Sequence, residues 1–169
     1  MSGSLILIDS ETASSSSSIS LTGMSSTFDV YMATIEGVTH SQASYDYVRF
    51  TVGGSADTSA NYDSAGKVLR TQGAFHNQVQ TNATFGYLSP YEKSTTAQDQ
   101  TNATIYIFNS QNSGEYTFAT FDETSKGTQV FGVQGGMVLA EAQITDGINF
   151  SPSAGNYPAG DFKLYGLKK

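Results

Sequence analysis

Residues 104–121, TIYIFNSQNSGEYTFATF, are the stretch of the chain that best indicates its fold. The first five of these residues are β-branched or aromatic, and residues 115–121 nearly alternate between polar and apolar side chains. Residues 109–114 between them are Asn, Ser, Gln and Gly, which are typical of a turn. The stretch therefore predicts a β-hairpin.

The same two-residue period recurs along the chain. In residues 45–52, Val48, Phe50 and Val52 share one face, which predicts an inner face. Residues 5–8 are a short continuous apolar run, which predicts a buried strand. Further strands are expected at residues 18–21, 28–35, 67–75, 84–88, 129–132, 137–144 and 161–167.

No segment shows helical periodicity, and turn residues recur at the short spacing of all-β proteins. We therefore predict an all-β protein of about ten short strands. The expected architecture is a single-domain antiparallel β-sandwich, jelly-roll-like, spanning residues 1–169.

Two loops, one turn and the N-terminal segment are also predicted. Residues 53–66 and 92–100 are polar, and we expect both to be exposed loops. Gly135 and Gly136 suit a tight turn between two strands. Residues 1–18 end in five serines and are expected to form either an extended arm or an edge strand.

The composition excludes several classes of function. The chain has no Cys, so it has no disulfide framework, thiolate metal site or cysteine nucleophile. Its formal net charge of −7 and eight Lys and Arg make nucleic acid an unexpected partner. No run approaches the ~18 apolar residues that cross a bilayer, and no basic segment precedes residues 5–8, so we expect no membrane partner and no signal peptide.

Side chains that could carry chemistry are few. His40 and His76 lack neighbours at zinc-ligand spacing, and no Gly-x-Ser-x-Gly motif marks a serine nucleophile, so we interpret both as polar residues of loops or strand ends. The adjacent Asp122 and Glu123 would point to opposite faces of a strand. Their carboxylates therefore do not form the catalytic pair of a glycosidase.

Two further groups of residues allow a binding function. Asp57, Asn61 and Asp63 could gather around a cation, although we interpret them as a hydrophilic loop. We expect four tyrosines in loops or on outer faces, where they could stack on sugars or contact protein, and we favour protein because the chain has no Trp: Tyr62, Tyr87, Tyr91 and Tyr157. The sequence thus predicts no catalytic, cofactor-binding or metal-binding residue.

Two parts of the chain resemble small virion structural proteins of tailed bacteriophages, especially phages of aquatic bacteria. The C-terminal part is a Gly- and Ser-rich stretch, residues 149–160, followed by a strand containing Leu164-Tyr165-Gly166. The N-terminal part is an apolar strand, a Thr-Ala-Ser segment, a turn with Gly and a strand with Tyr, at residues 5–8, 12–19, 21–24 and 27–31. Residues 53–100 depart from the family in loop content and length.

The resemblance implies a jelly-roll-like β-sandwich displayed on the virion, without enzyme activity or cofactor. The implied function is that of a capsid decoration, or cement, protein bound to the outer surface of the head. The expected partner is the major capsid protein or another virion protein, and we expect a homo-oligomer, a trimer above all, since trimers match the local symmetry of capsids.

Two other functions stay open. One is a tail-associated adhesion module that binds a host surface glycan, and a small polysaccharide hydrolase ranks third because no carboxylate pair stands out. The expected contacting parts are residues 1–18, 53–66 and 91–100.

Overall fold

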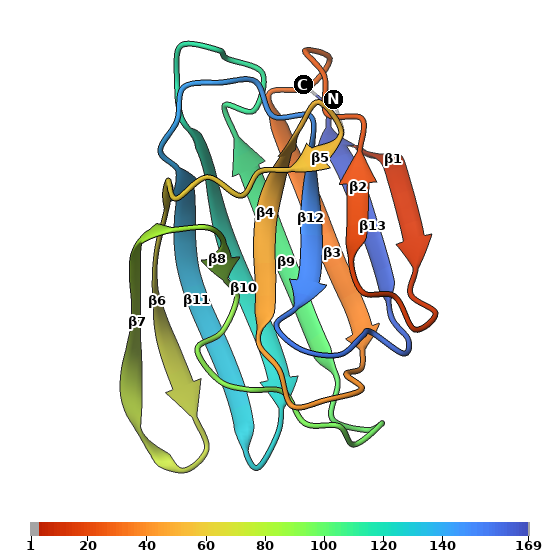
Figure 1. Ribbon diagram of the computed structural model, residues 1–169, viewed down its shortest axis with the longest axis vertical. Helices are drawn as coiled ribbons and strands as arrows, with labels where there is room; N and C mark the ends of the chain where they lie inside the picture. Colours follow the sequence, from red (N-terminus) through yellow and green to blue (C-terminus); the bar gives the residue numbers. More distant parts are fainter. Residues whose placement is uncertain (1–3, 169) are drawn as a thin grey trace.

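The computed structural model describes residues 4–168 and consists of two antiparallel β-sheets packed face to face (Figure 1). The larger sheet has eight strands in the order β1-β13-β3-β9-β10-β11-β6-β7. The smaller sheet has the order β2-β12-β4-β5, and β8 pairs with β4. The strands are β1 (Leu5–Thr12), β2 (Ile19–Thr22), β3 (Val30–Val38), β4 (Asp46–Val52), β5 (Ser55–Ala56), β6 (Tyr62–Arg70), β7 (Gly73–Ala83), β8 (Gly86–Tyr87), β9 (Thr101–Phe108), β10 (Thr117–Lys126), β11 (Val130–Leu139), β12 (Gly147–Pro152) and β13 (Asp161–Leu167).

The prediction of an all-β, jelly-roll-like antiparallel sandwich is confirmed. The described residues form thirteen strands rather than about ten, because several are only two to four residues long. They contain no helix, and therefore none long and apolar enough to cross a membrane. The predicted hairpin of residues 104–121 is present as β9 and β10.

The core lies between the sheets and takes alternate residues from each strand. Ile105 and Phe121 of the larger sheet belong to the same buried cluster as Phe50 and Ile148 of the smaller one. Val48 and Phe50 are buried as predicted, whereas Val52 is only half-buried because β4 ends there beside the short strand β5. Burial of such side chains supplies most of the stabilisation of the fold, at roughly 1.5–3 kcal/mol each.

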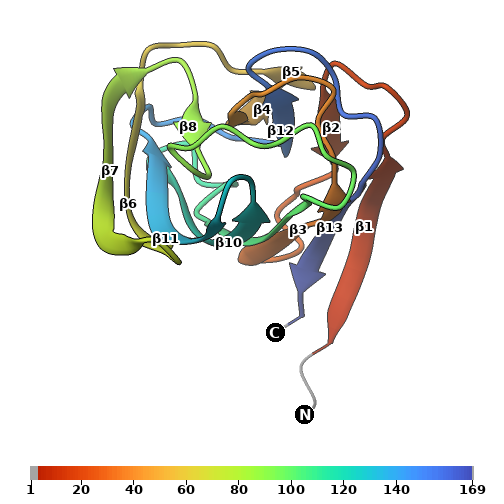
Figure 2. The same ribbon diagram turned by 90° about the horizontal axis from the view of Figure 1, so that it is seen from below.

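The larger sheet curls toward the smaller one at one side. Figure 2 shows β6 and β7 rising toward β8. The Gln78 side-chain amide on β7 donates a hydrogen bond to the carbonyl oxygen of Tyr87 on β8 at 3.0 Å, which connects the two sheets at this side.

Residues 5–8 form a strand, but the prediction that it is buried is wrong. β1 is the edge strand of the larger sheet, and Leu5 and Leu7 are about half exposed, at 51% and 54%. A short apolar run is compatible with a buried central strand or with an edge strand that has an uncovered apolar face. The sequence alone does not distinguish these cases.

The predicted turn at Gly135 and Gly136 is also wrong. Both glycines lie inside β11, so the strands predicted at residues 129–132 and 137–144 are largely one strand. A Cβ atom on Gly135 would lie 2.5 Å from Cζ of Phe121 and 2.6 Å from the carbonyl oxygen of Ala65. This glycine therefore serves a close approach of neighbouring strands, not a turn.

Residues 53–75 differ from the prediction in two ways. The loop predicted at 53–66 contains β5 and the first half of β6, where the inward-facing Tyr62 and Ser64 are buried. The strand predicted at 67–75 is divided by a turn at residues 71–72, and Gly73, the first residue of β7 after this turn, has a φ of +118°. The sequence predicts a loop in place of the first half of β6 because this segment contains few apolar residues. One of its inward-facing residues, Ser64, is polar.

We predict that Gly135→Ala lowers the free energy of unfolding by about 1–3 kcal/mol, since the added methyl overpacks the contact with Phe121. Gly132→Ala on the same strand is the control, because its Cβ would meet nothing closer than Leu69 Cβ at 3.8 Å. Denaturant-induced unfolding of both variants checks this. Equal stability of the two variants would contradict the packing argument.

Candidate functional site

One row of outward-facing residues crosses all eight strands of the larger sheet. The strand register places its members side by side, from β1 to β7: Leu7, Tyr165, Met32, Tyr106, Thr120, Gly136, Ala65 and Val79. Most of these side chains are apolar or aromatic, whereas the solvent face of an antiparallel sheet usually carries polar residues.

A second row runs beside the first. Val30, Phe108, Phe118 and Val138 lie next to one another on β3, β9, β10 and β11, and Asp63 on β6 ends the row. We call the two rows together the apolar band. Its most exposed members include Phe118 at 45% and, in the first row, Val79 at 76%.

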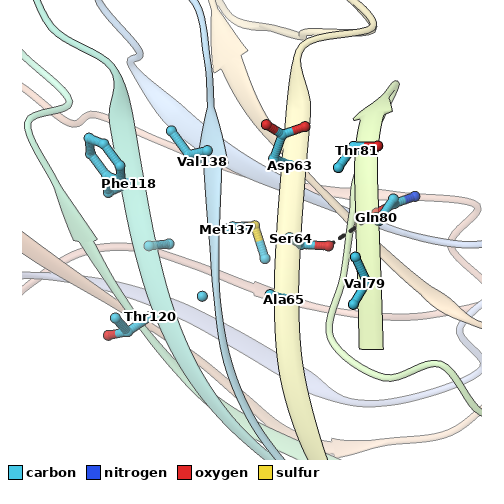
Figure 3. A pocket seen from close by; sticks show the side chains of 12 residues that line it. Asp63, Ser64, Ala65, Val79, Gln80, Thr81, Phe118, Thr120, Met137 and Val138 are labelled. Atoms are coloured by element: carbon cyan, nitrogen blue, oxygen red, sulfur yellow. Dashed lines mark hydrogen bonds between the residues drawn. The ribbon is translucent and has the colours of Figure 1, made fainter. Parts of the chain in front are cut away.

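The apolar band contains a shallow hollow of about 450 Å³ (Figure 3). Ala65 and its strand partner Gly136 line the hollow and carry little or no side chain, while Phe118, Val138 and Val79 stand around Ala65. Its exposed surface is almost entirely apolar. A hollow of this kind suits an apolar side chain of a protein partner.

The neighbouring rows of the same face are polar. Asp122 accepts a hydrogen bond from Gln134 at 2.8 Å, and Lys163 forms an ion pair with Glu36 at 3.1 Å. The face therefore has an apolar zone bordered by charged and amide side chains, which is the usual make-up of a protein interface with its rim.

The smaller sheet carries an aromatic cluster, which consists of Tyr45, Tyr47, Phe85 and Tyr87 together with Arg49. Tyr47 and Phe85 stack at 3.8 Å, and the ring of Tyr87 lies 5.0 Å from that of Phe85. The Arg49 guanidinium lies 5.4 Å from the Phe85 ring, and its Nε donates to the Thr84 carbonyl. All five side chains are half-buried, so parts of their surfaces meet solvent.

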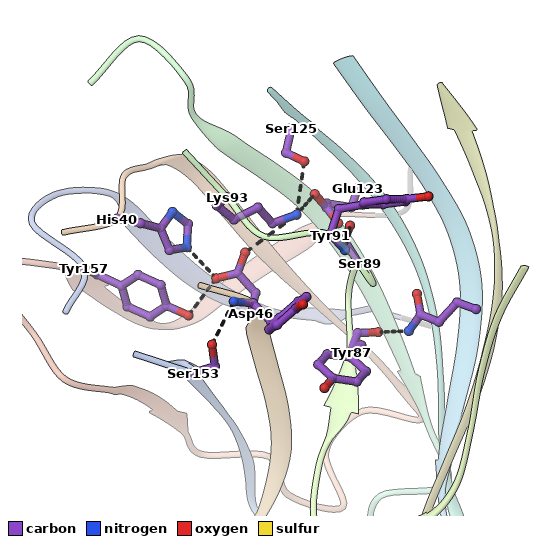
Figure 4. A network of polar contacts seen from close by, with 12 residues as sticks. His40, Asp46, Tyr87, Ser89, Tyr91, Lys93, Glu123, Ser125, Ser153 and Tyr157 are labelled. Atoms are coloured by element: carbon purple, nitrogen blue, oxygen red, sulfur yellow. Dashed lines mark hydrogen bonds and ion pairs between the residues drawn. The ribbon is translucent and has the colours of Figure 1, made fainter. Parts of the chain in front are cut away.

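A polar network lies inside the sandwich (Figure 4). Asp46 Oδ1 accepts hydrogen bonds from His40 Nε2 at 2.8 Å and from the Tyr157 hydroxyl at 2.9 Å. Burial alone raises the pKa of Asp46, but the hydrogen bond and charge of His40, the charge of Lys93 and the Tyr157 hydroxyl outweigh it and hold that pKa below its usual range. Burial, followed by the charge of Asp46, raises the pKa of Tyr157.

Lys93 joins a second carboxylate to this network. Its Nζ contacts Glu123 Oε1, donates to Ser125 Oγ at 3.1 Å and lies 4.0 Å from Asp46 Oδ2. The prediction that residues 92–100 are exposed is wrong for Lys93, because its backbone N–H pairs with the Ser44 carbonyl and draws the residue inward.

The histidines and tyrosines are distributed differently from the prediction. His40 lies in a loop after β3, as expected for a loop histidine, but it is buried.

Tyr62 and Tyr157 are fully buried, which corrects their placement in loops or on outer faces. Tyr91 is half-buried, stacks on Phe131 at 4.5 Å and has its hydroxyl against His76 Nδ1. Of the four tyrosines predicted to be exposed, Tyr87, in the aromatic cluster, and Tyr91 keep solvent contact.

The acidic candidates do not come together. Asp122 and Glu123 occupy opposite faces of β10, the first exposed and the second buried, as predicted. Asp57, Asn61 and Asp63 each form hydrogen bonds with different side chains or backbone groups. Within residues 4–168, no group of three or more His, Asp or Glu is placed to hold a metal ion.

We predict that Asp46 makes stability fall at acid pH. A folded-state pKa below the ordinary 3.8 means that its contribution is complete above that value and is lost as the pH falls through the folded-state pKa. Denaturant-induced unfolding between about pH 5 and pH 2 should therefore show a steeper loss for the wild type than for Asp46→Asn. Parallel curves would contradict this role.

No family model matches this chain, and no curated protein matches it. Among solved structures, the chain is similar to a single mutant of congerin II at 11% sequence identity, over 92% of this chain and 99% of the congerin chain, with a TM-score of 0.30. At that level the similarity says nothing about function. The site assignments therefore rest on the geometry described above.

Proposed function

We propose that this protein is a non-enzymatic structural protein of a bacteriophage virion, a decoration protein that binds the outer surface of the head through the apolar band. The observation that carries the proposal is the row of outward-facing residues across eight strands, on a sheet face that no other part of the described chain covers. Exposed apolar surface of this kind, interrupted in the row at the buried Met32, is typical of interaction sites.

The physical properties of the band favour a protein partner. Covering it removes apolar surface from water at a gain of roughly 25 cal/mol per Å². Apart from Asp63 at one end, its two rows contain no charged residue, so binding there desolvates few charges. Phe118 and Val79 flank the hollow and suit the role of anchor residues.

A decoration role also agrees with the charge of the chain. A protein with a net charge of −7 outside the shell is not drawn to the packaged genome. Binding across neighbouring capsid subunits would stabilise, by mass action, the form of the shell that the protein recognises. The partner is then the major capsid protein or another virion protein, and the expected homo-oligomer, a trimer above all, remains part of the proposal.

Immunogold electron microscopy tests the location of the protein. Gold-labelled antibody against the protein is applied to purified particles of the phage whose genome encodes it. Label over the heads is the expected result. Label confined to the tail would contradict the decoration role, and particles without label would contradict the virion assignment.

The binding surface is tested with Phe118→Ser and Val79→Ser. Each should weaken binding to undecorated heads by about 30-fold, which corresponds to the ~2 kcal/mol of an interface hot spot. Phe75→Ser is the control, because Phe75 is 64% exposed on the same sheet but lies outside the band. Co-sedimentation of each variant with heads measures the affinity, and equal losses in all three would refute the assignment of the band.

The aromatic cluster supports a second candidate, a tail-associated adhesion module that binds a host surface glycan. Exposed aromatic faces beside Arg49 offer stacking and hydrogen-bond donors of the type that sugars accept. Under this alternative, Phe85→Ala would abolish binding on a glycan array, whereas Phe118→Ser would leave it unchanged. Under the decoration proposal, the array shows no specific glycan.

A further inference from the structure

Lys93, Glu123 and Asp46 form an unusual group in the centre of the sandwich (Figure 4). Their side chains are 1%, 0% and 3% exposed. The Lys93 amine contacts one oxygen of Glu123, and the Asp46 carboxylate lies 4.0 Å from it on the other side. This arrangement brings together an amine, a carboxyl group that it contacts and a second carboxylate that can transfer protons.

Two carboxylate oxygens of this group lack hydrogen-bond partners. His40 and Lys93 lie against the two carboxylates, yet Glu123 Oε2 and Asp46 Oδ2 are buried without a hydrogen-bond partner. The burial of ions away from water is costly, and a lone buried carboxylate oxygen adds to that cost. A reaction that converts the Lys93–Glu123 ion pair into a neutral amide would remove the cost of burying those two charges.

We propose that Lys93 and Glu123 become joined by an isopeptide bond that the folded protein forms on its own, with Asp46 as the proton-transfer group. The bond would be a covalent modification built into the core. It does not depend on the function proposed above.

The reaction balances without any co-reactant. Asp46 Oδ2 takes a proton from the Lys93 ammonium, and the neutral Nζ attacks Cδ of Glu123, which forms the new C–N bond. A second proton from Nζ and the proton held by Asp46 pass to one Glu123 oxygen, its C–O bond breaks, and that oxygen leaves as water. Asp46 ends as it began, and an ammonium and a carboxylate have become an amide and one water molecule.

The two carboxylates differ in a way that assigns their roles. Asp46 Oδ1 accepts hydrogen bonds from His40 and Tyr157, which keep Asp46 ionised and leave Oδ2, 4.0 Å from Lys93 Nζ, as the oxygen that is free to take a proton. Glu123 Oε1 accepts from Lys93 and is the carboxyl group in contact with the amine. Glu123 is therefore the group attacked, and Asp46 the base.

The bond would connect the two sheets. Lys93 forms a bridge with Ser44, just before β4 of the smaller sheet, whereas Glu123 lies within β10 of the larger one. The linked residues are 30 positions apart in a chain that contains no cysteine. The link would constrain the unfolded chain as a disulfide does.

The mass of the purified full-length chain, measured after denaturation, tests the proposal. We expect a mass lower than the sequence mass by one water molecule, and tandem mass spectrometry of a digest should place the link between Lys93 and Glu123. An unchanged mass overturns the proposal. Loss of water at another position, or a link from Lys93 to Asp46, also overturns the assignment.

Variants test the individual roles. Lys93→Met and Asp46→Asn should each have the full mass of its own sequence, without loss of water. A link retained in Asp46→Asn would refute the role of Asp46 as the base. Lys163→Met is the control, because Lys163 forms an exposed pair with Glu36 at 3.1 Å and should not affect the link.

Glu123→Gln keeps the test valid if the other variants do not fold. The amine would then attack an amide carbon and release ammonia, so the mass should fall by one ammonia molecule and the same two positions should be linked. Circular dichroism identifies the variants that fold, and a folded Glu123→Gln protein of unchanged mass contradicts the mechanism.

Discussion

The burial of large tyrosines between the two sheets is the constraint on which the rest of the structure depends. The chain has no Trp, and Tyr31, Tyr62 and Tyr157 are among the largest side chains that are fully buried. A buried tyrosine hydroxyl needs a hydrogen-bond partner. Each has one: the hydroxyls of Tyr31 and Tyr62 accept from the backbone N–H groups of Ser25 and Phe50, at 2.7 and 3.0 Å.

The third buried tyrosine leads directly to the polar network. The Tyr157 hydroxyl donates to Asp46, and Asp46 in turn lies beside Lys93. A carboxylate in the core is tolerated only with donors and a positive charge around it. The aromatic core and the buried charges are therefore one connected arrangement, which fixes how residues 40–46, the Lys93 segment and β10 meet.

The sequence predicts the fold class well because the strands follow the period of two, and the hairpin of β9 and β10 follows directly from it. It fails where a residue's position depends on distant partners. Gly135 suggests a turn, but its role is set by Phe121 and Ala65 on neighbouring strands. Lys93 lies among polar residues that predict exposure, and its burial results from the pairing with Ser44.

The candidate binding surface was only partly predictable for the same reason. In β10, Phe118 faces outward and Phe121 inward, so aromatic residues occupy both faces of the strand. Alternation shows that such residues are on opposite faces, but it does not show which face the second sheet covers. The register across eight strands, rather than any local motif, brings Phe118 and Val79 to the same hollow.

The same strand links the interior to this surface. β10 carries Phe118 on its outer face and Glu123 on its inner face, where Lys93 holds it. An interface made from side chains of a rigid sheet loses less conformational entropy on binding than one made from loops. Anchoring the inner face of β10 to the smaller sheet therefore pre-organises the surface that faces the partner. The buried charges and the apolar band would then both serve binding, because the Lys93–Glu123 pair restrains β10 and β10 presents part of the apolar band.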